Sequence, residues 1–152
     1  MSEVKDFLEI LFQHKPPELY ILIWTLPEKK SFWAKTLDEA IQRVGELTES
    51  NVYVGVGLSN KNYGPNRRCE AKEIAGIVGL WADIDIAGPP HKKANLPPDE
   101  ASVDSLIEET GLKPTLLIHT GHGLHTWWLF KEPWIFESDE ERPEVGYAVT
   151  QL

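Results

Sequence analysis

The chain has 152 residues, 41% hydrophobic and 26% charged, a composition typical of one soluble domain with an apolar core. No run approaches the roughly 20 apolar residues of a membrane span, and acidic residues stand where a secretory signal would be basic, so we expect a cytoplasmic location. The single cysteine, Cys69, excludes an intramolecular disulfide and a cysteine-based zinc cluster. The net charge of -9 has the wrong sign for a domain that grips nucleic acid through its phosphates alone.

The first half of the chain predicts alternating helices and strands. Thr36, with Glu39 three residues later, has the capping-box pattern that begins a helix, and Pro27 ends the apolar run before it. The expected elements are a short amphipathic helix at 4–14, a strand at 19–26, a helix from residue 36, one strand at 51–59 and a basic loop at 60–69.

The second half predicts a long strand, a helix and a hairpin. The expected elements are a strand at 74–86, a loop at 87–98, a helix at 99–110 stopped by Gly111, two strands at 115–119 and 124–130, and a polar loop with the start of a helix at 135–152. This order predicts an α+β fold in one domain over residues 1–152.

Two carboxylates stand near the end of the predicted strand at 74–86. In the run LWADIDI, strand alternation puts Asp83 and Asp85 on one face and the apolar residues between them on the other. The apolar surroundings predict a buried strand, where unpaired charge is costly, so a cation beside the pair would sustain it. Hard oxygen ligands select Mg²⁺ or Mn²⁺ rather than Zn²⁺. Two solvent-exposed aspartates at a strand end are the alternative for this motif taken alone.

A glycine-rich turn followed by a histidine marks the predicted hairpin, in the run TGHGLHTWW at 120–128. Thr120, Gly121 and Gly123 form a turn whose backbone N–H groups, with the imidazole of His125, can hold phosphate oxygens. The same string also fits glycines needed only for the turn and a histidine with a structural hydrogen bond.

A rival metal site would use His119, His122 and His125, which recur every three residues. That spacing suits one face of a helix. The glycine, β-branched and aromatic residues around them favour strand and turn instead, where the three side chains would diverge. We therefore expect no metal site built on these three histidines.

The Asp-x-Asp strand and the Gly-x-Gly-x-His hairpin together resemble the first two motifs of the archaeo-eukaryotic primase superfamily. The likeness is to its primase-polymerase, RepB-like primase branch, encoded in plasmids, phages and mobile elements. It rests on the order and spacing of LWADIDI at 80–86 and HTGHGLHTWWLF at 119–130, and it covers roughly residues 19–134, including NVYVGVGLSNKNYGPNRRCEAKEIAGI upstream.

The resemblance implies a fold, a reaction and roles for single residues. The implied fold is an N-terminal α/β unit packed on an RRM-like antiparallel sheet. The implied reaction is primer synthesis or extension from (d)NTPs on a DNA template and primer, with Mg²⁺ or Mn²⁺. A helicase domain or subunit is a further partner to expect. Asp83 and Asp85 correspond to metal ligands of the family, and His125 to the histidine that contacts the phosphates of the incoming nucleotide.

Two arginines on the basic loop are further candidates for nucleotide binding. Arg67 and Arg68 precede the Asp-x-Asp strand and fit contacts to the triphosphate or the template. A solvated basic loop is the ordinary alternative for such a pair.

The chain departs from the family pattern at the third acidic motif. After Phe130 no carboxylate has strand-type apolar neighbours, and the acidic residues from Asp139 to Glu144 lie in a polar stretch. We therefore expect a truncated catalytic domain that lacks one metal ligand, so that this fragment is inactive alone.

Two other functions remain open at this point. One is a replication initiator that nicks DNA, with Tyr63 or Tyr147 as nucleophile, although the histidine pair that such enzymes use is absent. The other is a non-catalytic domain that binds nucleotide or nucleic acid within a larger replication protein.

Overall fold

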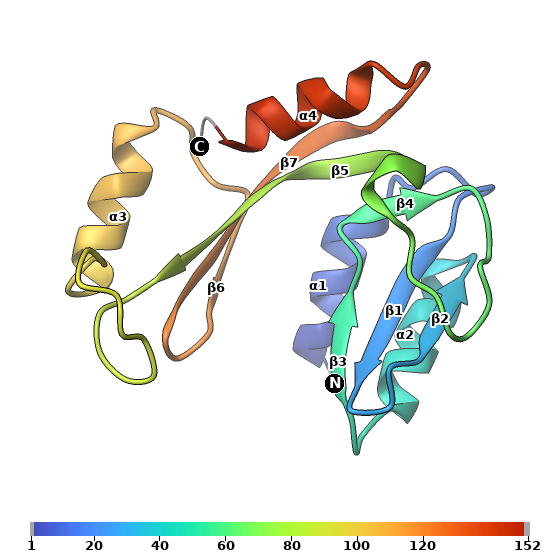
Figure 1. Ribbon diagram of the computed structural model, residues 1–152, viewed down its shortest axis with the longest axis horizontal. Coiled ribbons are helices and arrows are strands. Elements are labelled where there is room, and N and C mark those ends of the chain that lie inside the picture. The colour runs from blue at the N-terminus through green and yellow to red at the C-terminus, as the bar shows by residue number, and fades with distance from the viewer. Residues whose placement is uncertain (1, 151–152) are drawn as a thin grey trace. The chain divides into compact units, whose positions relative to one another are not determined.

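Residues 2 to 150 are described by a computed structural model, and they form a mixed α+β fold, as predicted (Figure 1). The elements in chain order are α1 (Ser2–Phe12), β1 (Ile21–Leu26), β2 (Ser31–Ala34), α2 (Leu37–Glu46), β3 (Asn51–Val54), β4 (Gly57–Ser59), β5 (Ile74–Asp85), α3 (Glu100–Glu109), β6 (Leu116–His119), β7 (Gly123–Ile135) and α4 (Glu141–Thr150), with a 3₁₀ turn at Ala71–Glu73.

The chain packs as two compact units, and strands β5 and β7 contribute to both. The first unit comprises Met1–Val78 and Phe130–Arg142, and the second comprises Gly79–Leu129 and Pro143–Leu152. The strands form two sheets, one of order β2-β1-β3 and one of order β4-β5-β7-β6.

The first unit is built on β1, which alternates between two environments. Ile21, Ile23 and Thr25 are buried on the face that the two N-terminal helices cover, and Figure 1 shows α1 and α2 behind this sheet. The helix α2 begins as predicted, because the Thr36 side chain accepts from the Glu39 backbone N–H and Glu39 accepts from the Thr36 backbone.

The predicted single strand at 51–59 is wrong: the structure has two strands in two sheets. Residues 51–54 pair with β1, and residues 57–59 pair with β5. The chain stays beside β1 throughout, since Gly55 N donates to Leu22 O and Tyr20 forms an isolated bridge with Ser59. It bends at Gly55, whose lack of a side chain leaves room for the Leu22 side chain.

The strand β2 was not predicted, because the turn before it lacks the usual signals. Hairpin turns generally use Gly, Asn or Asp where the backbone needs a positive φ. Here Lys29 takes that position, with φ 56°. The turn is closed by two hydrogen bonds, since Thr25 N donates to Lys30 O and Lys29 N donates to Thr25 O, and β2 then pairs antiparallel with β1.

The strands β5 and β7 lie side by side and run antiparallel. Near one end Ile86 N donates to His122 O at 3.0 Å, and near the other Phe136 N donates to Ala75 O at 2.9 Å. This pairing carries β7 to Ile135, five residues beyond the predicted strand end at 130. A Cβ built on Gly123 would lie 2.2 Å from Ile84 O, and one on Gly79 would lie 2.4 Å from Trp128 O.

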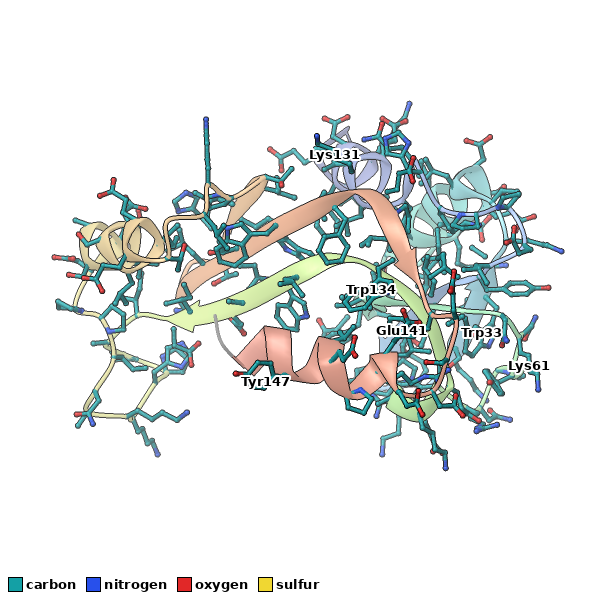
Figure 2. The ribbon with its side chains drawn as sticks, turned by 90° about the horizontal axis from the view of Figure 1, so that it is seen from above. Trp33, Lys61, Lys131, Trp134, Glu141 and Tyr147 are labelled. Carbon is teal, nitrogen blue, oxygen red and sulfur yellow. The ribbon has the colours of Figure 1, made fainter. Side chains whose placement is uncertain are left out.

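The start of α4 is fixed within the first unit. Trp134 Nε1 donates to Glu141 Oε1 at 3.1 Å, and Figure 2 labels both side chains beside the end of β7. Glu141 also accepts from the Ser138 backbone, as a residue at a helix N-terminus does. Arg142 Nε donates to Ile74 O at 2.9 Å, so α4 is tied to both β5 and β7. The predicted helix start after residue 135 is confirmed.

The second unit has its own apolar cluster. Val103 and Ile107 of α3 are buried against Leu124 of β7, with Ile84 and Ile86 of β5 packed beside them. The helix ends before Gly111, as predicted, and Gly111 has φ 68°. At its start the Asp99 side chain accepts from Ser102 N, so Asp99 is the N-cap rather than the first helical residue. This cluster lies on one face of the β5–β7 pair.

Replacing Gly123 tests the close approach of β7 to β5. We expect Gly123→Ala to lower the free energy of unfolding by about 1–3 kcal/mol, because the added methyl group meets a backbone carbonyl that cannot move away alone. Gly146→Ala is the control, since no atom lies within 4 Å of its Cβ position and alanine favours a helix. Chemical denaturation measures both, and equal stabilities for the two variants would contradict the packing.

Candidate active site

Asp83 and Asp85 project from the same face of β5, as predicted, and they lie in a more open environment than the sequence suggested. Ile84, between them, packs into the α3 cluster on the other face. The Asp83 side chain is 50% exposed and that of Asp85 is 36% exposed. The prediction of a buried strand is therefore wrong at this end of β5, because helix α3 covers only the face that carries the apolar residues.

His125 of β7 lies opposite Asp83. Its Nε2 atom is 3.3 Å from Asp83 Oδ1, and its ring makes an edge contact with Trp81 at 6.0 Å between centroids. Trp81 in turn stacks on Trp127 at 5.8 Å. Two successive cross-strand pairs, Trp81 with Trp127 and Asp83 with His125, thus occupy the face opposite α3. The strand register places the imidazole and the first carboxylate together.

Asp85 meets a different histidine. The next position on β7 is Gly123, which has no side chain, and a Cβ there would lie 3.1 Å from the Asp85 Cα. His91, from the loop after β5, lies with Nε2 3.3 Å from Asp85 Oδ1. The angles do not make this a hydrogen bond, so it is a close contact that becomes an ion pair when the ring is protonated.

His91 was missed by the sequence analysis. It stands in the Pro- and Lys-containing loop at 87–98, outside both motifs and without periodicity. The loop folds back through a bridge between Gly88 and His91, with Gly88 at φ 118°. The centroids of the His91 and His122 rings lie 6.2 Å apart. Gly88 ahead of a histidine was the one available signal, since glycine permits such a reversal.

The turn of residues 120–123 is held together internally. Thr120 Oγ1 and Thr120 N both donate to Gly123 O at 3.0 Å, and Gly121 takes φ 87°. The turn lines a cleft of about 320 Å³ that also receives Asp99 and Glu100 from the start of α3. Gly121 thus permits the positive φ of the turn, and Gly123 permits the close approach of β5 to β7. Phosphate binding by this turn stays a prediction, and the nearby carboxylates disfavour it electrostatically.

Arg67 and Arg68 belong to the first unit and differ in their contacts. Arg67 pairs with Glu73 and Glu70, and the hydrogen bond to Glu73 raises the pKa of its guanidinium. Arg68 lies over the ring of Trp24, 4.6 Å from its centroid. Carboxylates therefore already engage Arg67, whereas Arg68 stacks on an aromatic ring. Their predicted contacts with triphosphate or template stay predictions.

The three histidines of the rival metal site do not converge. His119 Nδ1 lies 3.3 Å from Glu100 of α3, His122 contacts the His91 ring and His125 contacts Asp83. Within residues 2 to 150, no group of three or more His, Cys, Asp or Glu side chains is arranged to hold a metal ion. The expectation that these histidines diverge is confirmed.

The proposed nicking nucleophiles have contrasting surroundings. The Tyr63 ring contacts the ring of Trp33, and the Arg67 guanidinium lies over it. Partial burial raises the pKa of the Tyr63 phenol. A raised pKa makes the phenolate nucleophile scarcer at neutral pH. Tyr147 on α4 is 68% exposed. The surroundings of Tyr63 therefore do not favour it as a nucleophile.

The donor set on β5 suits a hard divalent cation. Two carboxylates two residues apart on one strand face, each partly exposed, offer oxygen ligands that can be reached from solvent. Mg²⁺ is commonly bound through one or two carboxylates together with substrate phosphates and water. The residues present therefore fit an ion that arrives with a nucleotide better than an ion held by protein alone.

Comparison of the chain with protein-family models, with curated proteins and with solved structures found no match in any of the three. No helix within residues 2 to 150 is long and apolar enough to cross a membrane.

Nuclear magnetic resonance of the histidine rings tests this geometry. The chain has five histidines, few enough for their ring signals to be assigned. We expect Asp83→Asn to shift the signals of His125 most and Asp85→Asn to shift those of His91 most, because each carboxylate lies 3.3 Å from only that ring. Asp104→Asn, an exposed change on α3, should move neither. Equal shifts of His125 in all three variants would contradict the pairing.

Proposed function

We propose that this chain carries the nucleotide- and metal-binding site of a primase-polymerase, a DNA-directed nucleotidyltransferase of the archaeo-eukaryotic primase type. The observation that carries the proposal is the opposition of Asp83 and His125 across β5 and β7, with Asp85 on the same face. His125 and Asp83 are 42 residues apart in sequence, and their side chains lie 3.3 Å from one another. A shared site requires the strand register that brings the two motifs together, whereas two unrelated motifs would not require it.

In this proposal Asp83 and Asp85 hold a divalent ion, Mg²⁺ or Mn²⁺. Bound there, the ion would supply positive charge to the phosphates of a (d)NTP and to the oxygens that enter and leave during nucleotidyl transfer. The carboxylates are fixed by the apolar anchoring of Ile84 and Ile86, so their spacing is set by the strand rather than by flexible loops.

His125 binds a phosphate of the incoming nucleotide in this proposal. Its Nε2 atom lies 3.3 Å from Asp83 Oδ1, and its ring makes an edge contact with Trp81. An imidazole in that position can donate a hydrogen bond to a phosphate oxygen, and Asp83 orients the ring toward that side. The β5–β7 strand pair positions His125, and the order of the two motifs in the sequence supports primer synthesis as the reaction.

The proposal also covers the full fold and the reaction, and not only the binding roles of Asp83, Asp85 and His125. A primase-type core, with an N-terminal α/β unit on an RRM-like sheet, and the extension of a primer on DNA are part of the same proposal. Among residues 2 to 150 no third carboxylate joins Asp83 and Asp85 in a group that could hold a metal ion, so a third ligand would come from elsewhere. Binding of nucleotide and metal is therefore the step that this chain can be tested for directly.

Calorimetric titration with dATP and Mn²⁺ tests the carboxylates. We expect the variant with Asp83→Asn and Asp85→Asn to bind Mn²⁺–dATP about 10- to 100-fold more weakly, because it keeps the side-chain size and loses both anionic ligands. Asp104→Asn, with the same chemical change on exposed α3, should bind as the wild type does. Unchanged binding by the double variant, or wild-type binding that chelation of the metal leaves intact, would support a metal-independent binding domain instead.

His125→Ala separates the phosphate contact from the metal site. We expect weaker binding of dATP in the presence of Mn²⁺, because a hydrogen-bond donor to phosphate is lost, while the affinity for Mn²⁺ alone stays at the wild-type level. Manganese titration followed by electron paramagnetic resonance measures the second quantity. If the variant loses Mn²⁺ itself and not the nucleotide contact, His125 is a metal ligand and the assigned role is wrong.

A further inference from the structure

The first unit has a groove on the face of the β2-β1-β3 sheet that α1 and α2 do not cover. Because β1 alternates, Leu22, Trp24 and Leu26 point away from the buried Ile21 and Ile23. The groove has a volume of about 730 Å³ and lies wholly within this unit. It is lined mainly by β1, β3, the bend at 55–57 and the segment 68–71.

Residues 63–65 of the basic loop cover the β2 half of this sheet face. Trp33 Nε1 donates to Gly64 O at 2.8 Å, Ser31 N donates to Pro65 O at 2.8 Å, and the Tyr63 ring lies 5.4 Å from that of Trp33. These contacts close the sheet over β2. The half formed by β1 and β3 stays open.

The open half carries an aromatic pair. Trp24 and Tyr53 are direct cross-strand partners, with ring centroids 5.7 Å apart and planes tilted by 53°. Tyr53 is 49% exposed although it belongs to a sheet. Tyr53 lines the groove and is half-exposed, so its ring can stack with a flat ligand that enters from solvent.

Arg68 brings a positive charge to the same groove. Its guanidinium lies 4.6 Å from the Trp24 ring centroid, and among residues 2 to 150 it forms no ion pair with a carboxylate. An arginine stacked on a ring keeps its in-plane N–H donors directed outward, where they can grip a phosphate with two hydrogen bonds. The acidic neighbour Glu70 is already paired with Lys72 at 3.0 Å.

We infer that this groove binds single-stranded nucleic acid, with a base stacked on Tyr53 and a backbone phosphate on Arg68. A duplex does not fit this chemistry, because its bases are stacked and only their edges are accessible. A free nucleotide makes one stacking and one phosphate contact, and each stacked base contributes only about 1–3 kcal/mol, so a strand with several contacts binds better. The inference does not depend on the proposed nucleotidyl transfer, since it uses no residue of the Asp83–His125 site.

Fluorescence anisotropy with a labelled oligothymidylate of about 12 nucleotides, in the presence of a metal chelator, tests the groove. We expect Tyr53→Ala to weaken binding about 5- to 150-fold and Tyr53→Phe to keep the wild-type affinity, because stacking needs the ring and not the hydroxyl. Arg68→Gln should weaken binding and lower the slope of log affinity against log salt by about 0.7, the share of one phosphate contact. Tyr147→Ala, an exposed tyrosine on α4, is the matched control and should bind normally.

The competing outcomes are separable. Wild-type affinity in Tyr53→Leu would mean that an apolar segment, and not a base, occupies the groove, and would overturn the inference. No binding of the oligonucleotide by the wild-type chain would overturn it as well, as would equal competition by a duplex or by dTTP. The carboxylate double variant should bind the oligonucleotide normally in chelator, so a failure of the active-site proposal is seen apart from a failure of this one.

Discussion

The pairing of β5 with β7 is the constraint on which the candidate site depends. The two backbones approach where glycine replaces a side chain, at Gly79 and Gly123, and any larger residue would strike a carbonyl of the opposite strand. That register sets Trp81 against Trp127 and Asp83 against His125. A shift by one residue would turn each of these side chains to the other face and bring Ile84 and Leu124 out of the α3 cluster. Apolar packing on one face thus fixes polar chemistry on the other.

The two aspartates are equivalent in sequence and different in structure. Asp83 faces a histidine that the opposite strand holds in place, whereas Asp85 faces the bare backbone of Gly123 and the ring of His91 from a loop. Loops generally move more than paired strands. The first carboxylate therefore has a fixed partner, and the second has one that a loop movement can withdraw. In the proposed site, this difference would let Asp85 become accessible to a nucleotide while Asp83 keeps its geometry.

Local sequence signals predicted the elements that depend on local chemistry. The capping box of Thr36 and Glu39, the helix stop at Gly111, the hairpin after His119 and the shared face of Asp83 and Asp85 all follow from residues close in the chain. The missed features depend on contacts between distant segments. Lys29 in a left-handed turn, the bend at Gly55 and the extension of β7 past residue 130 are set by tertiary pairing that overrides propensity.

For the site, the sequence predicted which residues share a face and not how buried they are. Alternation along a strand is a local property, but exposure depends on which face a helix covers, and α3 covers only that of Ile84 and Ile86. His91 could not be found for the same reason, since its place beside Asp85 comes from the path of a loop.

In the proposed function, residues 83, 85 and 125 form one site for a metal-bound nucleotide. A crystal structure of the chain grown with Mn²⁺ and a non-hydrolysable dNTP, with anomalous scattering to locate manganese, would show whether they do. We expect manganese within about 2.0–2.6 Å of carboxylate oxygens of Asp83 and Asp85, and a phosphate oxygen in hydrogen-bond contact with His125. Manganese bound elsewhere, or nucleotide density away from His125, would contradict it.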